Sequence, residues 1–402
     1  MLTINRCPLL NLAGSIRVST VLEKALTYQV YRGIDEVPLE HWVNILSDGP
    51  IAYSPGYLSA IEHSGIGGLD DFHYIVMYDG EVPVCIATCY SFHTDLCEYT
   101  NSIIKSVVSY VRLYFPNLFF IKVLECGSAI NINASPFVVR PNTQLEQVIP
   151  ILKGCLKDIG SRVSARVIGI KDLSQDFVKT ESIEQRVSED DFTIISSVPG
   201  TFIPVKWRSI DEYVGSLKSY YRSKLNKHLR RNSVNNITSV LVEDFSTLSD
   251  QLAQQWIIVH NNTKEPKREV LNATFYKNLS NELDDKSKVL LFYSGEQLVG
   301  HALLVCDKET LRWLYIGKNN VMADSLYLYI MFKVIETGIS LGFDVIDCGP
   351  TNYSIKRDLG AKIDHQYYAM ALNFPIIRKL AGPLFRKLSY QNVPSSKNIF
   401  KL

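Results

Sequence analysis

Apolar runs separated by polar turns fill the stretch from Val289 to Ala361. Two runs, VLLFYS and QLVGHALLVCD, meet at Gly295-Glu296, a pattern typical of a β-hairpin. A third run, LRWLYIGK, predicts another strand, and SLYLYIMFKVIETGISLG has the spacing of a helix that ends at Gly342. DVIDCGP then predicts a short buried strand, and TNYSIKRDLGA predicts a polar turn leading into a short helix.

A similar pattern occurs earlier in the chain. The run FHYIVMYDGEVPVCIATCYSF predicts a hairpin, and its turn shares Tyr-x-Gly-Glu with the later hairpin. FFIKVLECGSAINI then stands where LRWLYIGKNN stands later, and a predicted helix with a late glycine, Gly160, and a buried strand follow. We interpret this as an internal repeat and predict two superimposable sheets, over residues 72–170 and 289–361. The alternative is that hairpins with a Gly-Glu turn are simply common.

The order hairpin, strand, polar loop, helix, strand, helix resembles the catalytic half of the GCN5-related N-acetyltransferase (GNAT) fold. Within that superfamily, the pattern G-x-x-x-Y-x-x-K-x-x-L-G-A is similar to the BioF2-like, FemAB-related branch. The resemblance implies an α/β fold of two tandem GNAT-like units, each a mixed, mostly antiparallel sheet flanked by helices. We expect a tail over residues 1–25, a divergent domain over 26–200 and an acyltransferase domain over 201–402. The matching residues are Gly349, Tyr353, Lys356, Leu359, Gly360 and Ala361.

Length and composition fit this organisation. A chain of 402 residues is too long for one small core and fits two domains. The formal net charge of +1 gives no overall attraction to nucleic acid or anionic lipid, so such a partner would need a local patch. The eight cysteines include no CxxC, so we expect reduced thiols, no metal site and a cytoplasmic protein.

No apolar run looks able to cross a bilayer. The best one, near Val107 to Cys126, is interrupted by Arg112, Pro116 and Lys122. The basic and apolar segment IIRKLAGPLFRKLSYQN could pack on the fold or touch a membrane surface, but Pro383 breaks it. We therefore expect no stable membrane insertion.

The resemblance implies an N-acyltransferase that moves an acyl group from an activated donor to an amine or amino-acid-like acceptor. In this superfamily the third and fourth strands of the catalytic unit splay apart, and the donor's pantetheine lies in the gap. The loop that would cradle the donor phosphates spans residues 317–325 here, and it lacks the Arg/Gln-x-x-Gly-x-Gly/Ala signature. This departure disfavours plain acetyl-CoA. It leaves a longer acyl-CoA, an acyl-carrier-protein thioester or an aminoacyl-tRNA as co-substrate, with no permanently bound cofactor.

Candidate catalytic groups lie on the strands beside the expected gap, namely His301, Tyr315 and Asp347. Their structural alternatives are a satisfied buried histidine, an interfacial ring and a turn cap. Tyr353 and Lys356 match the family's Tyr-x-x-Lys and are expected to bind a substrate carboxylate or phosphate. The basic helix near the start of the second unit and the phosphate loop supply the expected donor contacts. These are Arg222, Lys227, Lys318, Asn319, Asn320 and Ser325.

Two other functions remain open. The basic stretch from Tyr220 to Arg231 would suit an aminoacyl-tRNA-dependent transferase of the FemAB type, although it is equally explained as a solvated face. Against that function, the chain has no long Lys/Glu-rich helical hairpin like the one in cell-wall FemAB members. The absence of the signature glycines from the loop over residues 317–325 also fits a catalytically inactive binding module. The acyl group, the acceptor and the oligomeric state are not determined by the sequence.

Overall fold

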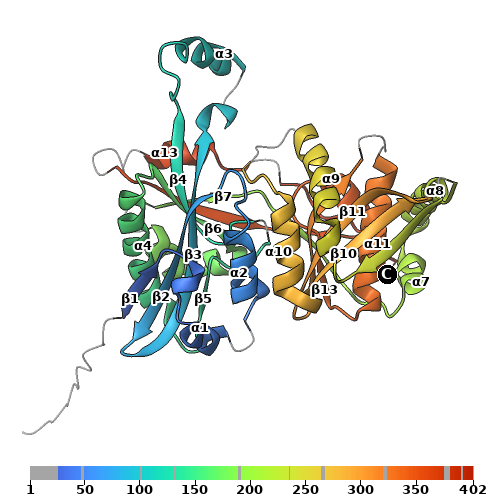
Figure 1. The fold of residues 1–402 in the computed structure, drawn as a ribbon, viewed down its shortest axis with the longest axis horizontal. Coiled ribbons are helices and arrows are strands. Elements are labelled where there is room, and N and C mark those ends of the chain that lie inside the picture. The colour runs from blue at the N-terminus through green and yellow to red at the C-terminus, as the bar shows by residue number, and fades with distance from the viewer. Residues whose placement is uncertain are drawn as a thin grey trace, which may run out of the picture.

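The structure is a computed structural model. It describes residues 26–46, 49–99, 102–130, 132–188, 192–234, 236–263, 268–319, 324–374, 381–390 and 393–401. The expected tail, residues 1–25, and Asn320 lie outside the described residues. Within those ranges the strands form one sheet of eight and another of seven (Figure 1).

The first sheet consists of β1 (Thr27–Tyr31), β2 (Asp70–Asp79), β3 (Val82–Asp95), β4 (Phe120–Cys126), β5 (Phe137–Val139), β6 (Val167–Ser174), β7 (Thr193–Ser196) and β15 (Gln366–Leu372). The helices of this half are α1 (Leu39–Leu46), α2 (Pro55–Glu62), α3 (Ser102–Val111), α4 (Leu145–Arg162), α5 (Gln175–Lys179), α6 (Glu181–Ser188) and α13 (Ala381–Lys387). The strand order is β1-β2-β3-β4-β6-β15-β7, with β5 paired to β3. Helix α4 makes the crossover that the parallel pair of β4 and β6 requires.

The second sheet consists of β8 (Gly200–Pro204), β9 (Ile237–Val242), β10 (Ser287–Ser294), β11 (Gln297–Asp307), β12 (Thr310–Lys318), β13 (Val345–Asp347) and β14 (Lys362–Asp364). Its helices are α7 (Ile210–Ser216), α8 (Ser219–Val234), α9 (Ser249–Asn262), α10 (Ala273–Leu283), α11 (Asp324–Ser340) and α12 (Tyr353–Asp358). The strand order is β9-β10-β11-β12-β13-β8-β14, and α11 connects the parallel strands β12 and β13.

The two sheets repeat one another in order and direction. In each, a hairpin is followed by an antiparallel third strand, a helix and a parallel fourth strand. Both hairpins turn at a glycine in the left-handed region, Gly80 at φ 63° and Gly295 at φ 60°. Both also shift register just before the turn, after Met77 and after Phe292. The two-unit fold expected from the internal repeat is confirmed.

The chain crosses between the sheets twice. β7 belongs to the first sheet, whereas β8, which follows it, pairs with β13 and β14 of the second. β14 belongs to the second sheet, whereas β15 returns to pair with β6 and β7 of the first. This corrects the assignment of all of residues 201–402 to the second unit. Each unit thus uses an exchanged strand to satisfy the backbone hydrogen bonds of its fourth strand, β6 or β13.

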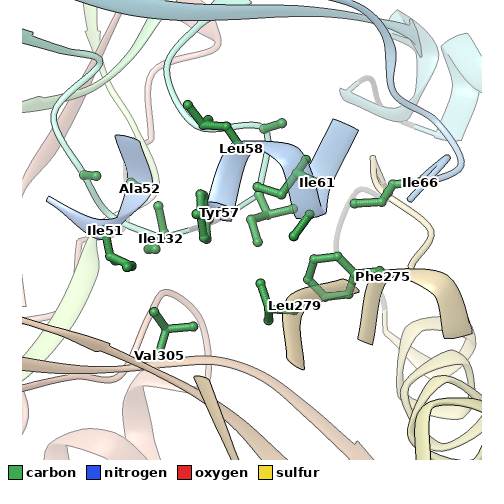
Figure 2. Close-up of a cluster of buried hydrophobic side chains, with 14 of the residues drawn as sticks. Ile51, Ala52, Tyr57, Leu58, Ile61, Ile66, Ile132, Phe275, Leu279 and Val305 are labelled. Carbon is green, nitrogen blue, oxygen red and sulfur yellow. The ribbon is translucent and has the colours of Figure 1, made fainter. Parts of the chain in front are cut away.

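A shared apolar core joins the two units (Figure 2). Tyr57 and Ile61 of α2 pack with Phe275 and Leu279 of α10, and Val305 of β11 belongs to the same cluster. All five side chains are buried. Burying a side chain of this size stabilises the fold by about 1.5–3 kcal/mol. This core therefore holds the two sheets against each other and fixes the space between them.

Candidate functional site

A cavity of about 370 Å³ lies between the two units. Strands β3, β4, β6 and β15 of the first sheet supply one side of its lining, and loops before α10 and after β13 supply the other. Val198 and Gln366 line it at the two places where the chain crosses between sheets. The charged and amide-bearing lining residues are Glu125, Asn133, Lys171, Asp172, Arg268, Glu269 and Gln366.

One wall is an ordered network around Glu125 of β4. Its Oε1 accepts a hydrogen bond from the Tyr368 hydroxyl at 2.6 Å, and its Oε2 accepts from Tyr90 and from Arg268 Nη1. Arg268 also donates from Nη2 to the Ala129 carbonyl at 2.9 Å. Both charged groups are therefore held by several partners within the protein.

A second carboxylate, Glu269, links this network to the second sheet. Its Oε2 pairs with Arg268 Nε, and its Oε1 accepts a hydrogen bond of 2.9 Å from the Tyr315 hydroxyl. Burial acts to raise the pKa of Glu269, but the Arg268 charge and the Tyr315 hydroxyl hold it below its usual range. Burial and the neighbouring carboxylate raise the pKa of Tyr315 well above its usual range. Glu269 is thus ionised and Tyr315 protonated at neutral pH.

Two further residues on the first-sheet side of the lining, Asp172 of β6 and Gln366 of β15, carry acceptor atoms with unused capacity. Asp172 Oδ2 lies 3.3 Å from Lys171 Nζ but accepts no hydrogen bond from any described residue. Lys171 Nζ instead donates to the Ser128 carbonyl at 3.1 Å. Gln366 Oε1 is likewise buried without a described hydrogen-bond partner. Burial raises the pKa of Asp172 against the opposing effect of Lys171.

His301 lies away from the cavity in a closed environment. Its side chain is fully buried, with Nε2 3.1 Å from the Tyr276 hydroxyl and Nδ1 2.9 Å from Gln255 Oε1. Burial lowers the pKa of His301 to about 3, so the ring is neutral. This geometry favours the structural alternative, a satisfied buried histidine.

The three expected catalytic residues share the face of the second sheet that meets the first unit, but none of them lines the cavity. Asp347 Oδ2 pairs with Arg312 at 3.0 Å, and its Oδ1 accepts from the Gly349 backbone N–H. Asp347 therefore caps the turn after β13. Among the three, only Tyr315 makes a recorded hydrogen bond to a cavity residue, Glu269.

Tyr353 and Lys356 hold loops at the cavity edge. The Tyr353 hydroxyl donates to the Pro199 carbonyl at 2.8 Å, between β7 and β8. Lys356 is buried and donates to the carbonyls of Gly349 and Pro350, and Pro350 lines the cavity. Burial lowers the pKa of Lys356 to about 8. Neither side chain lines the cavity between the units.

The strand gap implied by the resemblance is present. β12 and β13 pair only over residues 310–312 and 345–347. β12 then continues to Lys318, so beyond Arg312 this edge of β12 has no strand partner in the described part of the chain. Pro350 and Thr351, which follow β13, line the cavity, so the gap and the cavity border the same loop.

The expected donor contacts fall around this gap and on α8. Asn319 is engaged by the fold, since Nδ2 donates to the Leu298 carbonyl and Oδ1 accepts from Gln255. Lys318 is half-buried at the end of β12, and Ser325 lies in the first turn of α11, where its carbonyl accepts from Asn232. On α8, Arg222 is half-buried and Lys227 is exposed, and no residue of that helix lines the cavity. Their role in donor binding stays a prediction.

The residues that carry most charge in the cavity were not predicted from the sequence. Glu125 and Asp172 lie in apolar strands of the unit regarded as divergent, and Arg268 and Glu269 lie in a connecting loop. The sequence did contain a signal for them. Glu125 interrupts the apolar run VLEC, and Lys171 and Asp172 interrupt VIGIKDLS. Buried strands seldom carry charged residues without a partner. In the described residues, no group of three or more His, Cys, Asp or Glu could hold a metal ion.

Comparison with known proteins agrees with this architecture. The chain is 25% identical over 322 residues to "Putative 8-amino-7-oxononanoate synthase 2" of Mycobacterium tuberculosis. The match covers 78% of this chain but 41% of that relative's length.

Two solved structures have a similar fold. The C-terminal domain of a "Putative Lysylphosphatidylglycerol Synthetase" from Agrobacterium fabrum aligns with a TM-score of 0.51 at 10% identity, covering 83% of this chain and 91% of that one. FemX aligns with a TM-score of 0.50 at 12% identity, covering 87% of this chain and 98% of that one. At these identities the likeness concerns the fold alone.

A family model described as peptidoglycan biosynthesis/recognition matches residues 33–371, which include both crossings and all strands except β1 and the last residue of β15. With its two GNAT-like units and this match, the chain belongs to the FemAB-like family.

Proposed function

We propose that this protein is an N-acyltransferase whose amine acceptor binds in the cavity between the units. Its donor, an acyl-CoA or acyl-carrier-protein thioester, would lie at the strand gap between β12 and β13. The observation that carries the proposal is the pair of buried acceptor atoms, Asp172 Oδ2 and Gln366 Oε1, in residues that line the cavity. A buried acceptor without a donor is costly, and an amine or ammonium group supplies the missing N–H donors.

The charges of the lining support a cationic amine. Three carboxylates, Glu125, Asp172 and Glu269, face two cations, Lys171 and Arg268. Arg268 already pairs with the other two carboxylates of the lining, Glu125 and Glu269. Asp172 is therefore the carboxylate left to bind an ammonium group. Lys171 Nζ, with one recorded hydrogen bond, has donors left for a substrate carboxylate. This combination suits an amino-acid-like acceptor.

The arrangement also supports a route for the reaction. The acceptor nitrogen must first lose a proton, and Asp172, with its raised pKa, is placed to take it. The free amine then attacks the thioester carbonyl, the C–N bond forms, and the C–S bond breaks. The nitrogen loses its second proton as the C–S bond breaks. Tyr315, protonated and hydrogen-bonded to Glu269, is placed to give its own proton to the leaving thiolate and to take the proton from the nitrogen in exchange. Holding both substrates beside the loop after β13 supplies the proximity on which such transfers depend.

Aminoacyl-tRNA-dependent transfer is a second candidate. Helix α8 exposes Lys227, Arg230 and Arg231 on one short segment, as an RNA backbone contact would require. The description of the family as peptidoglycan biosynthesis/recognition also fits such a donor. The two candidates share the cavity as the acceptor site and differ in the donor.

Thermal-shift and thiol-release assays test the proposal. Purified protein is heated with a series of acyl-CoAs, with amino acids, or with both, and thiol release is then followed. We expect both ligand classes to raise the melting temperature, and thiol to appear only when both are present. Asp172→Asn should lose the amino-acid shift and keep the acyl-CoA shift. A full amino-acid shift in that variant would exclude the cavity as the acceptor site. Protection by aminoacyl-tRNA and not by thioesters would favour the second candidate.

A further inference from the structure

The connection between β3 and β4 forms an arm that stands away from both sheets. It contains η3 (Leu96–Tyr99), α3 and the turn that leads into β4. Figure 1 shows α3 at the top of the view, beyond the ends of the strands that carry it. Within the described chain, α3 packs chiefly against the adjoining η3.

The end of this arm exposes an unusual number of large apolar side chains. We call this group the apolar tip, and its members are exposed by 44–73%: Val107, Tyr110, Leu113, Tyr114, Phe115 and Phe119. Elsewhere the exposed large apolar residues are mostly scattered singly, as is normal for a protein surface. A contiguous exposed patch instead marks an interaction site.

The tip is held in shape by specific contacts. Arg112 forms two hydrogen bonds with the Asp95 carboxylate, at 2.6 and 2.7 Å, and two more to the Leu118 carbonyl. Its guanidinium also lies 4.5 Å from the ring centroid of Phe120. Phe119 adopts φ 65°, which is strained for a bulky residue. The strained backbone at Phe119 costs stability, and such strain is often found at functional surfaces.

The charge of the arm indicates the partner. The arm, residues 96–124, contains Lys105, Arg112 and Lys122 and one acidic residue, Glu98 of η3, so its formal charge is positive. The nearest carboxylates on flanking strands, Asp95 and Asp71, are each paired with one of these cations. The exposed Lys105 therefore adds positive charge with no acidic residue on α3 to offset it. A surface of aromatic rings with a positive margin is complementary to an anionic lipid interface.

We propose that the apolar tip docks this protein on the surface of an anionic lipid bilayer. Tyrosine and phenylalanine rings at the end of a projecting arm can enter the headgroup region while the two sheets stay in water. None of the helices in the described residues is long and apolar enough to cross a membrane. The contact would therefore be peripheral and reversible.

Vesicle sedimentation tests this docking. The full chain is mixed with vesicles of phosphatidylcholine alone or with phosphatidylglycerol, and the bound fraction is measured. The tip variant is Leu113→Ser/Tyr114→Ser/Phe115→Ser. Its matched control, Leu39→Ser/Val43→Ser/Leu341→Ser, removes three apolar side chains exposed by 45–55% elsewhere. We expect the control to bind anionic vesicles like the unmodified chain, and the tip variant to bind at least about tenfold more weakly.

Two further measurements sharpen the result. Phe115→Trp should shift its fluorescence to shorter wavelength when anionic vesicles are added. Lys105→Glu should weaken binding to anionic vesicles and leave any binding to neutral vesicles unchanged. Equal binding of the tip variant and the unmodified chain would overturn the proposal, as would no binding of the unmodified chain. Sedimentation velocity tests the alternative that the tip binds a second copy of the chain. Concentration-dependent dimers that are lost in the tip variant, together with no vesicle binding, would assign the tip to that contact.

Discussion

Arg268 Nη1 lies 3.0 Å from Glu125 Oε2, and this ion pair joins the loop before α10 to β4 of the first sheet. Arg268 is 21% exposed and Glu125 9% exposed at the side chain, so the pair is largely shielded from water. The Tyr90 and Tyr368 hydroxyls complete the coordination of the carboxylate. One contact therefore closes the cavity wall and connects the two units.

Removal of Arg268 should destabilise the whole fold. Arg268→Met would leave the Glu125 carboxylate buried without its counter-charge, and we expect the free energy of unfolding to fall by about 3 kcal/mol. Combining Arg268→Met with Glu125→Gln should cost less than the sum of the single changes, because no uncompensated charge remains. Urea unfolding of the four proteins measures both effects. Strict additivity would mean that the pair does not act as a unit.

Asp172→Asn should weaken acceptor binding and stabilise the fold. Asp172 has φ 55°, a conformation that asparagine tolerates well, so the change keeps the backbone unstrained. Losing the carboxylate should weaken binding of an amine acceptor at least about tenfold, the value of one charge-assisted hydrogen bond. Isothermal titration with amino acids checks this, and an unchanged affinity would remove Asp172 from the acceptor site.

The pH dependence of the same variant has a defined sign. Because the folded-state pKa of Asp172 is raised, the folded state holds the proton more tightly than the unfolded chain does. The stability of the unmodified protein should therefore fall as pH rises from the ordinary aspartate pKa through the raised folded value. Asp172→Asn should lack this loss of stability. Its melting temperature relative to that of the parent should therefore increase as pH rises over this range. A constant difference from pH 3 to pH 8 would contradict the raised pKa.

Local patterns predicted the two hairpins because alternation and glycine turns depend on neighbouring residues only. The exchange of β8 and β15 was beyond such reasoning. Each is a short strand whose place is decided by the open edge of β6 or β13, far away in the sequence. The cavity arises from this exchange, so its location could not be predicted either.

The catalytic candidates His301, Tyr315 and Asp347 were predicted on strands beside the gap, and their role stays a prediction. The sequence left His301 as either a catalytic group or a satisfied buried histidine, and its partners Gln255 and Tyr276 are distant in sequence. Glu125 and Asp172 were not among the predicted site residues, and only the packing of the second unit shows what they face. Periodicity assigns a residue to a face of a strand, whereas its partners come from tertiary structure.

Lys356 should give the protein a gain of stability in mildly alkaline solution. Burial lowers its folded-state pKa to about 8, below the ordinary lysine value of about 10.4, so the unfolded chain binds this proton more tightly. Stability should rise between about pH 8 and pH 10.4, by up to roughly 3 kcal/mol. Lys356→Met removes the titrating group and should remove that rise. If the free energies of unfolding of the two proteins change with pH in the same way over this range, Lys356 titrates normally.

Tyr315→Phe should separate chemistry from binding. It removes the hydroxyl that donates to Glu269 and keeps the ring among Trp256 and Phe275. If the hydroxyl protonates the leaving thiolate, kcat should fall by about a hundredfold with little change in KM. His301→Ala is the comparison, because its loss should lower the melting temperature rather than act on the chemical step. A kcat for Tyr315→Phe equal to that of the parent would leave Tyr315 a packing residue.

The basic face of α8 should bind the phosphates of the donor. Arg222→Ala/Lys227→Ala removes two cations that form no ion pair with any described residue, so the melting temperature should hardly change. Loss of charge-assisted phosphate contacts should raise the KM for a thioester donor at least about tenfold.

A neighbour on the same helix supplies the matched control for that double variant. Lys224 pairs with Asp358 at 2.5 Å, and this contact raises the pKa of Lys224. Lys224→Ala should therefore lower stability and leave the donor KM close to that of the parent. The defect of the double variant should shrink as salt rises, because screening weakens the parent's own contacts. If the folded double variant keeps the parental KM at low salt, α8 is a solvated basic surface and the donor phosphates bind elsewhere.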